Sequence, residues 1–164
     1  MLRKLFIIRH GKSSWESLVN DIDRPLTERG VKNSYEMAER FLRDANIPEM
    51  IFSSPANRAF HTALIMSRVW NIPDHKIQIA NELYLPDIDD ILSFISGMPD
   101  EVSSVAIFGH NPGFTHFANR YLRGDLENLP TAGVVVLSME LEKWNDIVKA
   151  RVEKDFVDYP KNTR

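Results

Sequence analysis

Short runs of apolar residues alternate along the chain with longer segments in which apolar side chains recur every three or four residues. The short runs predict buried strands, and the longer pattern predicts helices that cover a sheet. Because strands and helices alternate, we expect a three-layer α/β/α sandwich with a central, mostly parallel sheet. The pattern predicts strands at residues 2–9, 50–53, 76–80 and 103–108, and helices at residues 27–45, 54–69, 87–96 and 114–121.

The second predicted helix carries sequence signals at its start. Ser54 is a residue type that caps helices, and proline, here Pro55, is favoured at the first helical position. We therefore expect the helix to begin at these two residues. Helical spacing of the apolar side chains then predicts a buried face made of Phe60, Ala63, Leu64 and Val69.

The C-terminal part of the chain has the pattern of a β-hairpin. The apolar segments 134–141 and 147–152 predict two strands, and the polar residues between them predict a turn. No repeat or low-complexity segment interrupts the chain, so we expect residues 1–158 to form a single domain. Residues 159–164 are expected to form a frayed tail.

The composition is that of a soluble globular protein, with 43% hydrophobic and 26% charged residues. A formal net charge of −3 and a pI near 5.9 argue against general nucleic-acid binding, which usually needs a basic domain. The chain has no cysteine, which excludes a disulfide scaffold, a thiolate zinc site and a cysteine nucleophile. No apolar run is long enough for a signal peptide or a membrane span, so we expect a cytoplasmic protein that does not bind membranes.

Cationic and imidazole side chains follow three of the predicted strands, at the point where each strand ends. Arg9 and His10 end the first strand. Arg58 lies about one helical turn beyond the end of the second strand, and His110 follows the fourth. Ligands bind beyond the carboxyl ends of the strands in parallel α/β sheets, so we expect these four side chains to converge. Two guanidinium groups and two imidazoles around one cavity suit a dianionic phosphoryl group.

The motifs at these strand ends, taken in order, resemble those of a known family. RHG follows the first strand, SSPANRAFHTA the second and GHNPG the fourth. This series is similar to the histidine phosphatase superfamily, whose members have the phosphoglycerate-mutase-like fold. The short length and the segments DIDRPLTERG and GHNPG resemble the SixA-type phosphohistidine phosphatase branch of that superfamily. The resemblance covers residues 2–137.

The resemblance implies a role for each matching residue. His10 would be the nucleophile that attacks phosphorus and carries the phosphoryl group, a role that suits an imidazole because it titrates near physiological pH. Arg9 and Arg58 would bind the phosphoryl oxygens, and His110 would donate a hydrogen bond as charge develops on one of them. Glu82, in the loop after the third strand, is the expected general acid. No metal ion and no organic cofactor is expected, because the arginines supply the charge neutralisation.

The expected substrate follows from the space around the site. Larger members of the family insert long segments that cap the pocket, whereas only residues 81–102 separate the third and fourth strands here. We therefore expect an open cleft that accepts phosphohistidine on a protein, such as a signalling domain, and releases inorganic phosphate. A phosphatase of small phosphate monoesters is the alternative. A non-catalytic phospho-binding module is a third interpretation, against which His10 argues because a binder needs no nucleophile.

Several polar residues near the motifs are open to two interpretations. Asp21, Asp23 and Arg24 either line the mouth of the cleft or form a hydrogen-bonded loop before the first helix. Lys12 either contacts phosphate or belongs to a solvated loop, and the sequence favours the loop.

Overall fold

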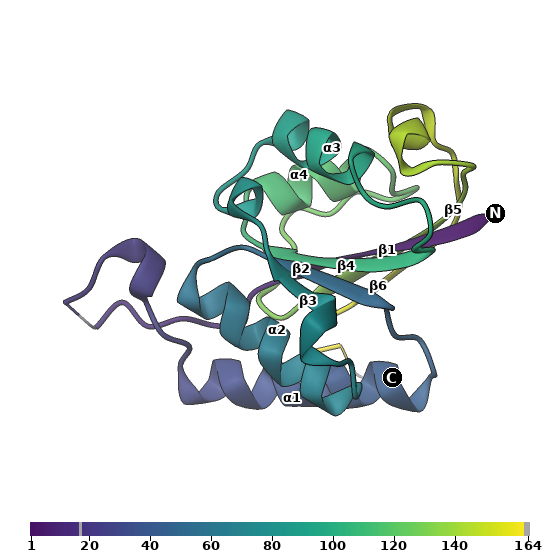
Figure 1. The fold of residues 1–164 in the computed structure, drawn as a ribbon. Coiled ribbons are helices and arrows are strands. Elements are labelled where there is room, and N and C mark those ends of the chain that lie inside the picture. The colour runs from purple at the N-terminus through teal and green to yellow at the C-terminus, as the bar shows by residue number, and fades with distance from the viewer. Residues whose placement is uncertain (17, 163–164) are drawn as a thin grey trace.

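The structure is a computed structural model of the chain and describes residues 1–16 and 18–162. Its centre is a six-stranded sheet with the strand order β3-β2-β4-β1-β5-β6 (Figure 1). The first four of these strands run parallel to one another, and β5 and β6 are each antiparallel to the strand before them. The strands are β1 (Leu2–Arg9), β2 (Met50–Ser53), β3 (Ile77–Ile79), β4 (Ser104–Gly109), β5 (Val134–Glu140) and β6 (Val152–Asp158).

Helices cover both faces of the sheet, with α1 and α2 on one face and α3 and α4 on the other (Figure 1). This arrangement confirms the predicted α/β/α sandwich with a mostly parallel sheet. No helix in the described part of the chain is long and apolar enough to cross a membrane. The helices are α1 (Glu28–Arg43), α2 (Asn57–Val69), α3 (Ile88–Ser96) and α4 (Gly113–Asn119), and the 3-10 turns are η1 (Asp21–Asp23), η2 (Asp74–Lys76), η3 (Asn81–Leu83) and η4 (Trp144–Lys149).

The strand order brings the carboxyl ends of β2, β4 and β1 next to one another. β4 lies between the other two, with Phe108 opposite Ser53 on one side and opposite Ile8 on the other. Gly109 then pairs with Arg9, the last residue of β1. The three segments that follow these strands therefore begin at one edge of the sheet, as the sequence predicts.

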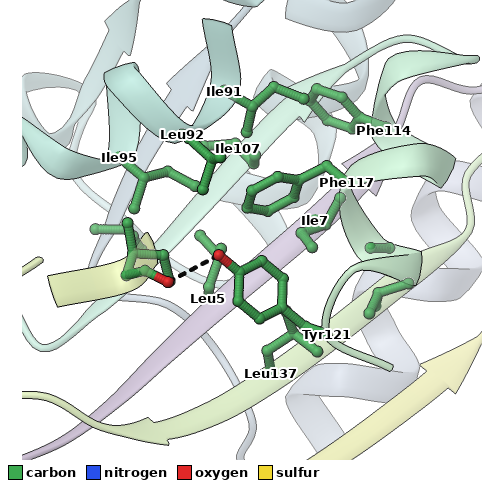
Figure 2. Packing of buried hydrophobic residues seen from close by; sticks show 14 of the residues in the cluster. Leu5, Ile7, Ile91, Leu92, Ile95, Ile107, Phe114, Phe117, Tyr121 and Leu137 are labelled. Carbon is green, nitrogen blue, oxygen red and sulfur yellow. Dashed lines mark hydrogen bonds between the residues drawn. The ribbon is translucent and has the colours of Figure 1, made fainter. Parts of the chain in front are cut away.

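The core between the sheet and the helices α3 and α4 holds the site segments in place. Figure 2 shows side chains from several elements meeting there, among them Leu5, Ile7, Ile91, Phe117 and Leu137. Full burial of one such side chain typically contributes about 1.5–3 kcal/mol. The Tyr121 hydroxyl donates a hydrogen bond to the carbonyl of Ile147 at 2.8 Å, so the polar atom in this core has a partner. This packing fixes α4, which begins at the end of the segment after β4.

The predicted start of the second helix is wrong. α2 begins at Asn57, whereas Ser54 and Pro55 lie in the segment between the strand and the helix. The Ser54 N–H donates a hydrogen bond to the carbonyl of Phe108 at 2.9 Å, so Ser54 continues the pairing between β2 and β4. A backbone that still pairs with a neighbouring strand cannot also form the first turn of a helix.

The predicted buried face of this helix is only partly correct. Ala63 is buried, but Phe60 and Leu64 are half-exposed, as is Val69. The face that is turned inward carries Ala59 and Met66 instead. The inward face combines the small Ala59 with the larger Met66, whereas Phe60, Leu64 and Val69 are only partly covered.

The C-terminal hairpin exists, but its second strand is not at residues 147–152. That strand is β6, and the residues before it form the turn η4. Trp144 and Ile147 in η4 are fully buried, and the Trp144 indole N–H donates to the carbonyl of Val102 at 2.8 Å. Both residues fill the core from a turn, and Ile147, the first residue of the predicted strand, explains why its segment resembles a strand.

The start of the predicted frayed tail is attached to α1. Arg40 donates hydrogen bonds to the carbonyl oxygens of Tyr159 at 3.0 Å and Pro160 at 2.8 Å. The Asn162 N–H in turn donates to the carbonyl of Tyr159 at 2.9 Å. Residues 163 and 164 lie outside the described residues, and the domain boundary after residue 158 stays a prediction.

Candidate active site

A cleft of about 410 Å³ lies beyond the carboxyl ends of β1, β2 and β4. It brings together the four side chains that were predicted to converge, namely Arg9, His10, Arg58 and His110. Among the described residues that line the cleft, Asp21 carries the only carboxylate. The remaining lining residues are Lys12, Ser13, Trp15, Arg24, Leu85, Asn111 and Thr131. The cleft is therefore positively charged and suits an anionic ligand.

His10 follows β1 directly, and hydrogen bonds fix both its backbone and its ring. Its N–H donates to the carbonyl of Gly109 at 3.1 Å, and its carbonyl accepts from the N–H of Ala132 at 3.0 Å. Its Nδ1 lies 2.6 Å from the carbonyl oxygen of Gly11. A carbonyl can only accept, so Nδ1 carries the proton and Nε2 keeps a free lone pair.

The environment keeps the His10 ring neutral. Burial is the largest cause that lowers its pKa, and the positive charges of Arg58 and Arg9 lower it further, to about 4. The hydrogen bond to Gly11 acts in the opposite direction but does not offset these effects. At physiological pH the imidazole is therefore an uncharged base with a lone pair on Nε2, the form in which it can attack an electrophile.

His110 lies beside His10, with their ring centroids 5.2 Å apart. Its Nε2 is 2.8 Å from the hydroxyl oxygen of Ser54, which also accepts a hydrogen bond from the N–H of Ala56 at 3.2 Å. When the Ser54 hydroxyl donates its proton to Nε2, the ring proton of His110 lies on Nδ1. Burial, and next the neighbouring His10, lower the pKa of His110 to about 3, so the ring is neutral.

The Nδ1 atom of His110 is buried and has no hydrogen-bond partner within the described ranges. A buried donor without a partner is costly, typically about 1–3 kcal/mol, and such groups call for an explanation. His110 lines the cleft, so this atom without a partner belongs to a side chain that borders the space open to a ligand.

Hydrogen bonds from the Nη atoms hold the guanidinium groups of Arg9 and Arg58 in place. Other nitrogen atoms of these groups make no such bond with a residue that the structure describes. Nη1 of Arg9 donates to the carbonyl of Leu129 at 2.9 Å. Nη1 and Nη2 of Arg58 donate to the carbonyl and the carboxylate of Asp21 at 2.7 and 3.1 Å. The Nε atoms of both arginines are buried and have no partner in the described part of the chain. Both arginines line the cleft, so an anion that entered it would meet two guanidinium groups.

Asp21 connects the two sides of the cleft. Its carboxylate accepts hydrogen bonds from Tyr84 at 2.6 Å, from Arg58 at 3.1 Å and from Arg24 at 3.1 Å. The hydrogen bond from Tyr84 is the largest cause that lowers the pKa of Asp21, and Arg58 lowers it further, to about 2. Asp21 is therefore an anion that orients the arginines and is not a proton donor near neutral pH. Asp21 and Arg24 line the cleft, whereas Asp23 does not.

Arg24 is held by several partners. Its Nη1 donates to the hydroxyl of Ser13 at 2.9 Å, and its guanidinium carbon lies 3.4 Å from the ring centroid of Trp15. The indole is 78% exposed, and a cation–π contact at an exposed site is worth about 0.5–1 kcal/mol. Trp15 and Arg24 thus form one wall of the cleft mouth.

The glycine of the RHG motif is required because two backbone segments touch there. A Cβ on Gly11 would lie 2.8 Å from the carbonyl oxygen of Gly30 in α1, and one on Gly30 would lie 2.2 Å from the carbonyl oxygen of Lys12. The Gly11 N–H also donates to the hydroxyl of Thr62 in α2 at 3.0 Å. A side chain at either glycine would push the loop after β1 away from both helices.

The structure does not bring Glu82 into the cleft. Glu82 lies in η3, where it is exposed, and it is not among the residues that line the cleft. Tyr84, a little further along the chain, contacts the site instead, because its hydroxyl binds Asp21 and its ring centroid lies 5.5 Å from that of His110.

Sequence reasoning missed the roles of Ser54, Thr62 and Tyr84. Ser54 and Thr62 belong to the segment SSPANRAFHTA, which could have marked them as candidates. Tyr84 gave no signal, because its contact with Asp21 joins residues 63 positions apart. Such a contact depends on how η1 and η3 are placed by the fold.

The residues of the cleft suit an anion better than a metal ion. Within residues 1–16 and 18–162, no group of three or more histidine or acidic side chains could hold a metal ion. The imidazoles of His10 and His110 are also surrounded by guanidinium groups, which would repel a cation.

An α/β/α sandwich with paired arginines and histidines at the ends of parallel strands has the architecture of a histidine phosphatase. The model of the histidine phosphatase superfamily (branch 1) matches residues 5–93, which is more than half of the chain. The chain therefore belongs to the histidine phosphatase superfamily.

Two curated relatives show how far the similarity extends. An uncharacterized chloroplastic protein of Arabidopsis thaliana is 28% identical over 155 residues, which cover 88% of this chain and 70% of that protein. A 2,3-bisphosphoglycerate-dependent phosphoglycerate mutase of Cutibacterium acnes is 32% identical over 89 residues, which cover 50% of this chain and 35% of the mutase.

Solved structures share the fold over nearly the whole chain. A protein named as a candidate phosphohistidine phosphatase SixA, from Nakamurella multipartitia, matches with a TM-score of 0.83 at 25% identity, covering 99% of this chain and 98% of that one. A candidate SixA from Agrobacterium tumefaciens matches with a TM-score of 0.76 at 25% identity, covering 94% and 97%. The chain thus has the phosphoglycerate-mutase-like fold in its SixA form.

Proposed function

We propose that the chain is a metal-independent phosphatase that removes the phosphoryl group from phosphohistidine on a protein. Membership of the histidine phosphatase superfamily supports phosphatase chemistry. The nucleophile, the other site roles and the substrate are our proposals, and the geometry of the cleft supports each of them.

In the first step, the lone pair on Nε2 of His10 attacks phosphorus. The new N–P bond forms as the bond from phosphorus to the substrate's imidazole nitrogen breaks, and the electrons of that bond leave with the substrate's imidazole. The hydrogen bond from Nδ1 to Gly11 holds the ring in the required tautomer. In the second step, water attacks phosphorus, the N–P electrons return to His10, and inorganic phosphate leaves.

Arg9, Arg58 and His110 stabilise the charge on the three phosphoryl oxygens. The side chains of Arg9, Arg58 and His110 all line the cleft, so a phosphoryl group bound there would meet two guanidinium groups and an imidazole. Fixed donors of this kind are commonly worth about 10²–10³-fold each in turnover. The guanidinium groups replace the charge neutralisation that a metal ion gives in other phosphoryl-transfer enzymes.

None of the described residues of the cleft is a suitable acid to protonate the leaving group. This observation is the basis for the proposed substrate. Asp21 is the carboxylate that lines the cleft, and its lowered pKa, about 2, keeps it ionised. Glu82 lies outside the lining. An alkoxide leaving group needs a proton donor, whereas the imidazole of phosphohistidine can be protonated near neutral pH before it leaves.

The mouth of the cleft also supports a phosphoryl group presented on a protein. Trp15 and Leu85 line the cleft and are 78% and 55% exposed. Exposed apolar side chains at the mouth of a polar site are typical of surfaces that meet a protein.

The test compares three substrates side by side: a phosphohistidine protein, a phosphoserine peptide of matched sequence and a small alkyl phosphate. We expect the phosphohistidine protein to be hydrolysed with the highest kcat/KM. Rapid quenching with labelled substrate should trap acid-labile, alkali-stable label on His10, and His10→Ala should carry none. A preference for the alkyl phosphate, or label that persists in His10→Ala, would refute the proposal.

A further inference from the structure

A second cavity, of about 310 Å³, opens beside the cleft. Lys12 and Thr131 line both cavities, so the two are adjacent. We call this second cavity the basic groove, since three of its lining residues are the cations Lys12, Arg29 and Lys161. Its other lining residues, in the described part of the chain, are uncharged: Asn33, Pro130, Thr131, Tyr159 and Pro160.

The three cations of the basic groove have no ionic partner among residues 1–16 and 18–162. The side chains of Lys12, Arg29 and Lys161 are exposed, and none makes an ion pair or hydrogen bond with another residue that the structure describes. The chain as a whole is acidic, with a formal charge of −3. Three such cations around one hollow, on an acidic protein, create a local positive potential.

Lys161 belongs to a segment that is fixed in place. Arg40 of α1 donates to the carbonyls of Tyr159 and Pro160, which directly precede it. Arg40 also forms an ion pair with Asp158 at 3.3 Å, and Asp158 is fully buried. These contacts hold the wall that carries Lys161 against α1, the helix that also carries Arg29.

The wall shared with the cleft is tied to the nucleophile itself. Thr131 precedes Ala132, whose N–H donates to the carbonyl of His10 at 3.0 Å. The next residue, Gly133, accepts a hydrogen bond from the N–H of Arg9 at 3.1 Å. The basic groove therefore lies at a fixed position relative to a phosphoryl group bound at His10.

We propose that the basic groove binds acidic side chains that flank the phosphohistidine of the protein substrate, an inference that rests on the proposed function. A phosphoryl group carried on a protein brings its neighbouring surface across the rim of the cleft, and the groove begins at that rim. Its positive charge is complementary to carboxylates. A nucleic acid is a poorer occupant, because three cations offer few phosphate contacts and the net charge of the chain is negative.

The experiment measures binding of labelled peptides that carry a stable phosphonate analogue of phosphohistidine. The peptides differ only in their flanking residues, which are glutamate, glutamine or lysine, and fluorescence anisotropy gives each Kd at low and at physiological salt. Exposed ion pairs are individually weak, so we expect the glutamate peptide to bind about five- to tenfold more tightly than the glutamine peptide. Salt should reduce this difference.

Two double variants separate the groove from a general charge effect. Arg29→Glu/Lys161→Glu should abolish the preference for the glutamate peptide, and neither residue lines the catalytic cleft. Arg43→Glu/Lys76→Glu makes the same change in net charge at residues away from the groove, one in the last turn of α1 and one in η2. This control should keep the preference.

Each outcome bears on the inference. Equal Kd values for the glutamate and glutamine peptides, absence of measurable binding by both, or loss of the preference in the control variant would overturn it. The inference would also be overturned if single-stranded RNA displaced the labelled glutamate peptide at lower concentrations than the unlabelled glutamate peptide does. Turnover of phosphohistidine and phosphoserine peptides with the same flanks separates the two proposals. If only the phosphoserine peptides are turned over, and faster with glutamate flanks, the basic groove is supported and phosphohistidine is rejected as the substrate. If phosphohistidine peptides are turned over at the same rate with all flanks, phosphohistidine is supported and the role of the basic groove is rejected.

Discussion

Acidification from pH 7.5 to pH 5 should destabilise the fold through the two histidines of the cleft. The pKa of His10 is lowered to about 4 and that of His110 to about 3, whereas an unfolded histidine ionises near 6.5. Between these values the unfolded chain binds more protons than the folded chain, so stability falls as pH falls. The stability is fully present above pH 6.5 and is lost progressively toward pH 4.

The size of the effect follows from the same pKa values. At pH 5 the unfolded histidine is almost fully protonated while the folded one is neutral, which lowers the free energy of unfolding by about 2 kcal/mol per histidine. Asp21 does not contribute in this window. Its pKa is lowered to about 2, so its stabilisation is present above pH 3.8 and is lost only below that pH.

Urea unfolding followed by circular dichroism, at pH 7.5 and pH 5, measures the effect in the parent protein and in variants. His10→Asn should remove about 2 kcal/mol of the pH dependence, with an unchanged m value. His75→Asn, at an exposed position in η2, shows how much of any change comes from removing a histidine outside the cleft. NMR titration of the His10 ring gives its pKa directly.

Two results would refute this reasoning. One is a pH dependence in His10→Asn that equals that of the parent protein. The other is a measured pKa of His10 at or above 6.5, which would mean that the ring is not kept neutral by burial and by the arginines. The second result would also weaken the proposed nucleophile, because its lone pair would be protonated over much of the physiological range.

Three further predictions concern the charge balance, the acid and the packing of the site. Activity should survive exhaustive chelation because guanidinium groups neutralise the phosphoryl charge, and loss of activity with rescue by a divalent ion would contradict this. Glu82→Gln should leave turnover of phosphohistidine and of an alkyl phosphate nearly unchanged, and a loss above about tenfold with either would restore Glu82 as an acid. Gly113→Ala should lower the free energy of unfolding by about 1–3 kcal/mol or more, because its Cβ would lie 1.9 Å from the carbonyl oxygen of Pro86. Gly124→Ala is its control, since no atom lies within 4 Å of a Cβ there, and equal effects of the two substitutions would contradict the packing argument.

The convergence of Arg9, His10, Arg58 and His110 could be predicted because it depends on a general property of parallel sheets. The carboxyl ends of neighbouring strands share one edge, so residues that follow such strands meet whatever the details of packing. The strand pattern located these ends closely, and β2 was predicted with the bounds that the structure has.

The errors arose where tertiary contacts override a local signal. Pro55 suggested a helix start, but Ser54 still pairs with β4. Ile147 suggested a strand, but it fills the core from a 3-10 turn. The hydrogen bond between Asp21 and Tyr84 had no local signal at all, so no sequence pattern could indicate that Tyr84, and not Glu82, contacts the site.

The wall formed by Trp15 and Arg24 gives the chain an intrinsic optical reporter. The other two tryptophans, Trp70 and Trp144, are 3% and 0% exposed and lie in the two cores, so their fluorescence provides a steady background. Trp15 is the solvent-facing indole, and its emission depends on the guanidinium group 3.4 Å from its ring. An anion that draws Arg24 toward the cleft would change that contact. We therefore expect occupancy of the cleft to appear, in the unlabelled protein, as a change in the fluorescence of Trp15.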